Sequence, residues 1–132
     1  MSLVGTVDQA EEKAREKGLV CVMPKPNELF IDIDSALAYE TFQAGYALLR
    51  EGGQQVEIVR ETPSPSGKPW RKHIVIDLRR TVKSEIERIA LQAILGSDLK
   101  REALSWLHLQ SGTTDVSRLF EKPQPVEEIE SF

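Results

Sequence analysis

The chain has 132 residues, with 17 Lys and Arg against 21 Asp and Glu, so its formal net charge at pH 7 is −4. A composition of 40% hydrophobic and 29% charged residues is that of an ordinary globular domain, and it excludes collagen-like and wholly disordered chains. No apolar run reaches the roughly 18 to 20 residues that a bilayer span needs, and the first residues lack the pattern of a signal peptide. We therefore expect a cytoplasmic protein without a membrane partner.

Cysteine and histidine are scarce in this sequence. The single cysteine, Cys21, excludes an internal disulfide, and one cysteine with two histidines gives too few ligands for a structural zinc site. Because Cys21 lies in an apolar run, we interpret it as a core residue.

The first half of the chain predicts a helix, a strand and a second helix. Residues 7–17 are rich in helix formers and end at Gly18. Apolar and acidic residues alternate over residues 28–34, which predicts a strand, and this strand could begin as early as Leu19. Ser35 is suited to cap a helix that ends at the Gly52-Gly53 pair.

The second half predicts two strands and then two helices. Residues 54–61 and 70–78 alternate as strands, and the Pro, Ser and Gly residues between them predict a loop. Thr81 or Ser84 is suited to begin the first of these helices, which ends at Gly96, and Ser97 or Asp98 is suited to cap the second. We expect one α+β domain over residues 1–120, with helices on one face of a small, mostly antiparallel sheet, followed by an acidic tail over residues 121–132.

Two aspartates stand two positions apart at the end of the first predicted strand. Asp32 and Asp34 therefore project from the same face, where a divalent cation such as Mg²⁺ or Mn²⁺ would relieve the repulsion between their carboxylates. A simpler explanation is that both are solvated and that Asp34 or Ser35 only caps the next helix. The residue pattern does not decide between the two.

A second group of polar residues shares one face of the strand at 70–78. His73, Asp77 and Arg79 occupy alternate positions, so they meet Asp32 and Asp34 if the two strands are neighbours. His73 would then contact a phosphate, and Asp77 would be a third metal ligand. The alternatives are a surface histidine and an ion pair between Asp77 and a neighbouring arginine.

Positive charge is concentrated in one segment. Residues 60–83 hold seven Lys and Arg against two acidic residues, a balance of +5, whereas the remainder holds ten against nineteen, a balance of −9. Such a segment indicates contact with phosphate or nucleic acid. Trp70, inside it, either offers a stacking face to a base or packs beneath the loop.

These residues resemble the core of the archaeo-eukaryotic primase superfamily. The similarity covers about residues 28–78: an apolar strand ending in Asp32-Ile33-Asp34, a helix, a strand, a Ser/Gly-rich loop and a strand with His73. The resemblance implies a core like the RNA-recognition motif, Asp32 and Asp34 as ligands of divalent metal, and His73 as the contact to nucleotide phosphates. It places Ser66 and Gly67 in the loop that approaches this histidine. We add Lys68, Arg71, Lys72 and Arg79 as candidate phosphate-binding residues.

The sequence departs from that family in two ways. Arg71 stands where the family has a small residue, and Asp77 lies on the strand of the histidine instead of a separate strand. Asp98 and Asp115 are poorer substitutes for the third acid. The chain also has little room for modules that hold template and primer. We therefore expect a minimal member of the phage or prophage type.

Three functions are compatible with the sequence. The first is a primase-polymerase-like domain that binds divalent metal and a nucleotide or nucleic-acid phosphate, with nucleotidyl transfer as its reaction. The second is a non-catalytic accessory or protein-interaction module of phages or prophages with the same fold. The third is a nucleic-acid binder without chemistry, which the negative total charge disfavours.

Overall fold

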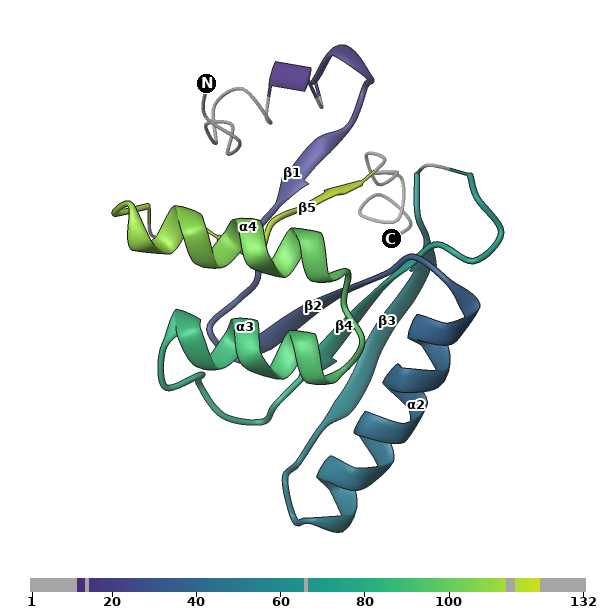
Figure 1. Cartoon of the computed structure of the whole chain (residues 1–132), viewed down its shortest axis with the longest axis vertical. Coiled ribbons are helices and arrows are strands. Elements are labelled where there is room, and N and C mark those ends of the chain that lie inside the picture. The colour runs from purple at the N-terminus through teal and green to yellow at the C-terminus, as the bar shows by residue number, and fades with distance from the viewer. Residues whose placement is uncertain (1–11, 14, 66, 114–115, 122–132) are drawn as a thin grey trace, which may run out of the picture.

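The fold is organised around the strand in which apolar and polar residues alternate. In the computed structural model, which describes residues 12–13, 15–65, 67–113 and 116–121, Leu29, Ile31 and Ile33 of this strand are fully buried. The labelled elements (Figure 1) are β1 (Val20–Val22), β2 (Glu28–Ile33), α2 (Ala36–Glu51), β3 (Glu57–Pro63), β4 (Lys72–Asp77), α3 (Glu85–Ile94), α4 (Leu99–Gln110) and β5 (Leu119–Glu121).

Two antiparallel sheets make up the β-structure of the described residues. The larger has the order β2-β4-β3, and the smaller pairs β1 with β5. The α+β class with antiparallel sheets is thus confirmed. The segment at Val20 is a separate strand of the smaller sheet, not an extension of β2. The predicted helix at 7–17 lies largely outside the described residues, and of the predicted tail at 121–132 only Glu121 is described, as the last residue of β5.

The main core lies between one face of the larger sheet and α2. Leu29, Ile31 and Ile33 of β2 and Ile74 and Ile76 of β4 form this face. Phe42 from α2 and Leu95, just after α3, pack against this face, and the cluster also contains Val56, Leu78 and Val82. Tyr39 and Tyr46 flank Phe42 as stacked rings. The strand parity inferred from the sequence is confirmed for β2 and β4.

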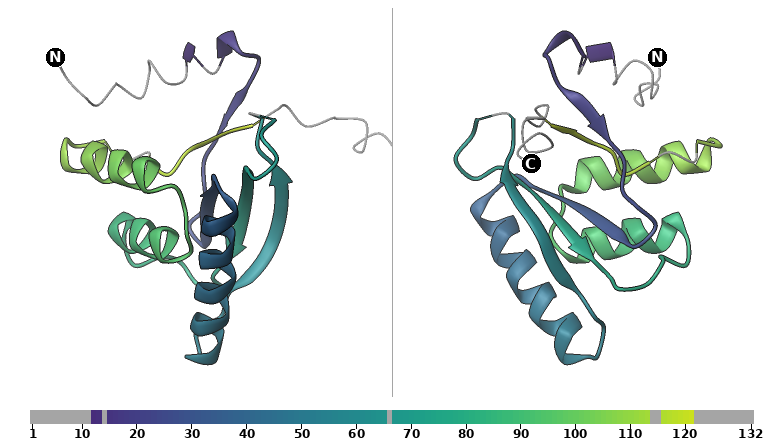
Figure 2. Two further views of the ribbon diagram at one scale, coloured as in Figure 1. Left: turned by 45° about the vertical axis from the view of Figure 1, so that its right-hand side comes forward. Right: turned by 180° about the vertical axis from the view of Figure 1, so that it is seen from behind.

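The opposite face of the sheet is covered by the smaller sheet. Leu119 of β5 and Val22 of β1 pack on Phe30 and Val75. Figure 2 shows the β1–β5 pair crossing the larger sheet near one end of its strands, with α3 and α4 on the β2 side. Leu91 of α3 packs on the same core as α2, and α3 and α4 also border the edge of β2.

The helices begin at the residues that the sequence predicts as caps. The hydroxyl of Ser35 accepts a hydrogen bond from the Ala38 amide, that of Ser84 from the Glu87 amide, and the Asp98 carboxylate from the Lys100 amide. Each cap satisfies an amide that the first helical turn leaves without a partner. Among the described helices, none is both long and apolar enough to cross a membrane.

Polar groups of α3 and α4 close the free edge of β2. Gln92 accepts from the Phe30 amide at 2.8 Å, Arg101 donates to the Phe30 carbonyl at 2.9 Å, and Arg88 donates to the Glu28 carbonyl at 3.0 Å. These groups take the place of a neighbouring strand, because an edge strand otherwise leaves its outward amides and carbonyls unpaired.

Candidate functional site

Asp32 and His73 are brought together on the sheet face opposite α2. They are direct partners in the β2–β4 register, and His73 Nε2 lies 3.7 Å from Asp32 Oδ1. His73 is 5% exposed and the Asp32 side chain 25% exposed. The two strands are neighbours, which is the condition that the sequence left open, and their register leaves the carboxylate accessible beside a buried imidazole.

A second carboxylate contacts the other nitrogen of the same imidazole. Glu121, the last residue of β5, has Oε2 3.3 Å from His73 Nδ1, and the residue is 5% exposed. Arg60 Nη2 donates to its other oxygen at 2.9 Å, and Thr62 Oγ1 lies 3.4 Å from Oε2. Glu121 was assigned to the tail from its acidic surroundings, so sequence reasoning missed it. The apolar pair Leu119-Phe120 directly before it was the available signal of a strand.

The backbone of Asp32 is fixed by the residues that begin α4. Its amide donates to Ser97 Oγ at 3.0 Å, and its carbonyl accepts from the Asp98 amide at 2.8 Å. Ser97 Oγ in turn donates to Glu102 at 2.7 Å. Asp98, which the sequence offered only as a poor substitute for a third acid, is thus anchored directly to Asp32.

Burial raises the pKa of the Asp32 carboxyl above its ordinary value. Desolvation is the largest cause, and Asp98 adds to it, whereas His73, Arg101 and Arg71 each favour the ionised form. Two guanidinium groups therefore act on the same carboxylate.

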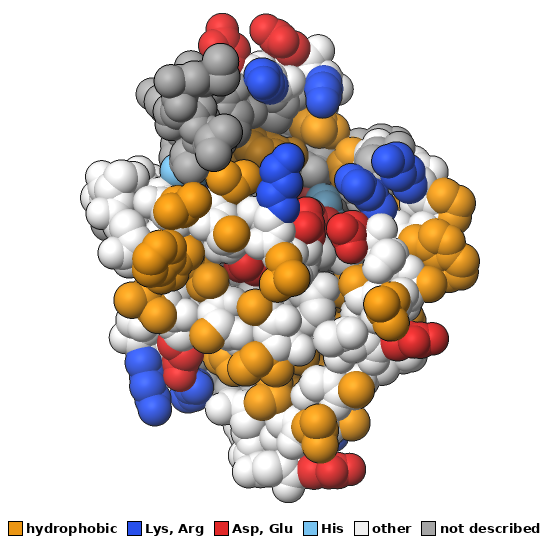
Figure 3. Space-filling model, viewed as in Figure 1, with side chains coloured by type: hydrophobic (Ala, Val, Ile, Leu, Met, Phe, Trp, Pro, Cys, Tyr) orange, Lys and Arg blue, Asp and Glu red, His pale blue; other side chains and the backbone are white. Residues whose placement is uncertain are grey.

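Figure 3 shows acidic, basic and histidine side chains gathered between the start of α4 and the β3–β4 loop.

Both of these arginines carry a buried N–H donor without a partner. Arg71 Nε and Arg101 Nη2 are inaccessible to solvent and make no hydrogen bond within the part of the chain that the structure describes. Buried donors in native proteins are nearly always paired, so an unpaired one calls for an explanation such as a missing ligand. Arg71 was predicted as a phosphate contact, whereas Arg101 was missed because it lies on a helix remote in sequence.

The β3–β4 loop supplies the remaining predicted cations. A pocket of about 480 Å³ is lined by this loop and the adjoining strand ends, including Gly67, Lys68, Arg71 and Lys72. Lys72 Nζ pairs with Glu61 at 3.1 Å and lies 4.1 Å from the centre of the Tyr39 ring. Trp70 is 60% exposed, so it does not pack beneath the loop. Ser66 lies outside the described residues.

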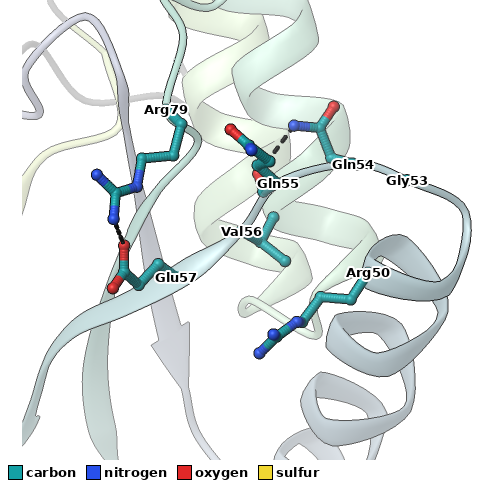
Figure 4. Close-up of a pocket in the computed structure, with 7 residues that line it drawn as sticks. All are labelled: Arg50, Gly53, Gln54, Gln55, Val56, Glu57 and Arg79. Atoms are coloured by element: carbon teal, nitrogen blue, oxygen red, sulfur yellow. Dashed lines mark hydrogen bonds and ion pairs between the residues drawn. The ribbon is translucent and has the colours of Figure 1, made fainter.

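Asp77 and Arg79 lie at the opposite end of the sheet. Asp77 pairs with Glu28 in register, four residues from Asp32 along β2, a separation of about 13 Å at the usual strand rise. Its carboxylate accepts from Asn27 and from the Arg79 amide, and these hydrogen bonds lower its pKa. Figure 4 shows Arg79 turned to Glu57 beside a pocket that Arg50 also lines.

The carboxylates named from the sequence do not form one metal-binding set. Asp34 is exposed just beyond the end of β2, and Asp77 is too far from Asp32 to share an ion with it. Within the described residues, no group of three or more His, Cys, Asp or Glu side chains is arranged to hold a metal. Asp77 is therefore not placed to act as a third ligand beside Asp32.

Comparison with known proteins identifies no relative. No protein-family model, curated protein or solved structure matches the chain.

Proposed function

We propose that this chain binds a nucleotide, or a terminal phosphate of nucleic acid, at the end of the sheet where Asp32, His73 and Arg71 meet. The observation that carries the proposal is the pair of buried N–H donors, Arg71 Nε and Arg101 Nη2, which have no partner and belong to the two guanidinium groups acting on Asp32. Guanidinium groups are well suited to phosphate oxygens, because their planar donors match them in geometry and charge.

The charge around the site supports an anionic ligand. Lys68 and Lys72 line the adjoining pocket with Arg71, and the segment 60–83 carries a balance of +5 within an acidic chain. This local field favours a phosphate group while the negative remainder disfavours indiscriminate binding to long polyanions. The exposed ring of Trp70 is placed on the same loop, where it could stack on a base.

Asp32 contributes orientation in this proposal. Its carboxylate lies beside the imidazole of His73. It repels a misplaced anionic group but accepts a hydrogen bond from a hydroxyl or amino group of the correct ligand. We infer that the ligand presents a hydrogen-bond donor to Asp32 and an anionic group to Arg71. A nucleotide has both.

The test is a calorimetric titration of the full chain with nucleoside triphosphates and with 5′-phosphorylated and 5′-hydroxyl oligonucleotides. Replacing Arg71 by Gln is expected to weaken binding about tenfold or more, since a hydrogen bond to a charged group is worth about 1.5–3 kcal/mol. Arg50→Gln removes the same charge from an exposed residue at the other end of the sheet and serves as the control. Equal affinity in wild type and Arg71→Gln would refute the proposal.

Nucleotidyl transfer, the reaction that the resemblance implies, is a separate proposal with its own test. Primer extension with Mn²⁺ is compared between wild type, Asp32→Asn and Asp34→Asn. Extension that both substitutions abolish would support catalysis by the aspartate pair.

A non-catalytic module is favoured by one observation: the third predicted carboxylate, Asp77, lies at the far end of β4. If this function is correct, nucleotide binding occurs without extension in wild type. It would be excluded by primer extension that requires Asp32.

A further inference from the structure

The carboxylate of Glu121 lies in a pocket built from three hydrogen-bond donors. Arg60 and Thr62 stand two positions apart on β3, and His73 is the β4 partner of Thr62. Their side chains reach the same carboxylate, with Arg60 Nη2 at 2.9 Å, His73 Nδ1 at 3.3 Å and Thr62 Oγ1 at 3.4 Å. Side chains of β3 and β4 therefore hold the buried carboxylate of Glu121, which belongs to β5.

The strand that delivers Glu121 is not part of the larger sheet. β5 pairs only with β1 in the described residues, through three residue pairs, and Glu121 stands in the terminal pair opposite Val20. Leu119 fixes β5 separately, by packing on Phe30 and Val75. Opening the single terminal pair would therefore release the carboxylate while Leu119 remains in place.

The three donors are those that bind phosphate in proteins. A guanidinium, a hydroxyl and an imidazole can donate to a phosphate oxygen as they do to a carboxylate oxygen. A phosphate carries more negative charge and more acceptor oxygens than a carboxylate, so it can satisfy the same donors at least as well. Glu121 consequently occupies a position that a phosphate group would fit chemically.

This position adjoins the proposed binding site through one shared side chain. The imidazole of His73 faces Asp32 with Nε2 and Glu121 with Nδ1. A ligand that places one phosphate at Arg71 and a second, linked phosphate on the far side of His73 would span both positions. That describes a diphosphate group more closely than a monophosphate.

We propose that Arg60, Thr62 and His73 form a second phosphate subsite, that Glu121 fills it in the free protein, and that a diphosphate-bearing ligand displaces Glu121. The inference rests on the proposed function and refines it, because it names the ligand class as a diphosphate or triphosphate. Glu121 then acts as an internal competitor, which lowers the measured affinity by the fraction of molecules in which the subsite is open.

The test uses pyrophosphate as the probe, titrated calorimetrically into the full chain at fixed ionic strength. Glu121→Gln is expected to raise the affinity about tenfold, the gain when a subsite that is open in roughly a tenth of the molecules becomes fully open. Adding Arg60→Gln to this variant is expected to cancel the gain. Glu57→Gln, which removes the same charge from an exposed residue at the far end of β3, is expected to leave the affinity near that of wild type.

An unchanged or lower affinity in Glu121→Gln would overturn the subsite and assign Glu121 a purely structural role. An equal gain in Glu57→Gln would also overturn it, because the gain would then reflect net charge alone. A second measurement requires no variant: saturating pyrophosphate should accelerate amide hydrogen exchange at Glu121 in wild type, and unchanged exchange would overturn displacement.

The arginine variants separate this proposal from the function on which it rests. If Arg71→Gln weakens pyrophosphate binding and Glu121→Gln brings no gain, the subsite alone is refuted. If wild type and Glu121→Gln both fail to bind pyrophosphate while wild type still binds a nucleoside triphosphate more tightly than Arg71→Gln does, the subsite is refuted and the proposed function stands.

Discussion

The side chain of Gln92 is expected to be among the most sensitive polar positions in the protein. It is fully buried, accepts from the Phe30 amide at 2.8 Å, and donates to Glu102 Oε1 at 2.8 Å and Ser117 Oγ at 3.0 Å. Leucine has nearly the same size but makes none of these hydrogen bonds. Gln92→Leu therefore removes the hydrogen bonds without a large cavity.

The cost follows from the groups left without partners. The Phe30 amide on the β2 edge and one oxygen of Glu102 both lose their hydrogen bond. Each buried group left without a partner lowers the free energy of unfolding by about 1–3 kcal/mol. We expect a loss of about 3 kcal/mol or more in the free energy of unfolding, a substantial part of the roughly 5–15 kcal/mol that such domains have.

Urea denaturation of wild type and Gln92→Leu measures this loss. Gln43→Leu, an exposed glutamine on α2, is the matched control and should change stability by no more than about 0.5 kcal/mol. Amide exchange at Phe30 should also accelerate in Gln92→Leu. A loss below about 1 kcal/mol would show that the β2 edge does not depend on this side chain.

Three further substitutions test the electrostatics and the close packing. Burial raises the pKa of Asp32, so the folded state binds the proton of this carboxyl more tightly than the unfolded chain does. The stabilisation that this proton gives is lost as pH rises through the raised pKa. Asp32→Asn should therefore unfold at a higher urea concentration than wild type at pH 7, and the difference should disappear below about pH 3.8. Glu87 behaves in the opposite way, because hydrogen bonds from Arg80 lower its pKa to about 2: the stability lost in Glu87→Gln at pH 7 should vanish as pH falls from about 4.5 to 2 in the same assay. Gly96 has φ +82°, and an added Cβ would lie 2.6 Å from a backbone oxygen of α2, so Gly96→Ala should lower the free energy of unfolding by about 2 kcal/mol or more. Gly53 has φ +92° but open space around it, so Gly53→Ala should lower this free energy by less. Equal losses in the two variants would mean that the close contact at Gly96 is unimportant.

Much of the fold could be predicted because the decisive interactions are local. Alternation in β2 and β4 fixes which side chains face α2, and Ser35, Ser84 and Asp98 each cap a helix through an amide two or three residues away. These signals depend only on near neighbours in the chain, so the sequence displays them directly.

The site could be predicted only in part. Strand parity placed Asp32 and His73 on one face, but the register that separates Asp77 from Asp32 depends on how β2 and β4 align over their whole length. A shift along two antiparallel strands leaves the hydrophobic pattern of each strand unchanged when it spans two residues. Sequence alternation therefore could not decide how far apart the carboxylates lie.

The contributions of Arg101 and Glu121 could not be inferred from motifs at all. Arg101 reaches the Phe30 carbonyl across 71 residues, and Glu121 reaches His73 across 48. Each looks like an ordinary surface charge in its own segment. Only the packing of α4 and β5 beside the sheet shows that both are partly or wholly buried at the site.

The two edge strands of the larger sheet, β2 and β3, differ in how many of their outward backbone groups are already hydrogen-bonded. With the outward groups of β2 already bonded to Gln92, Arg88 and Arg101, another chain has no unpaired backbone to join there. β3 is the other border of that sheet, and its side chains are mostly exposed, including Val59 at 57%. An added strand would therefore have to pair with β3, the border of the larger sheet that has no described strand beside it.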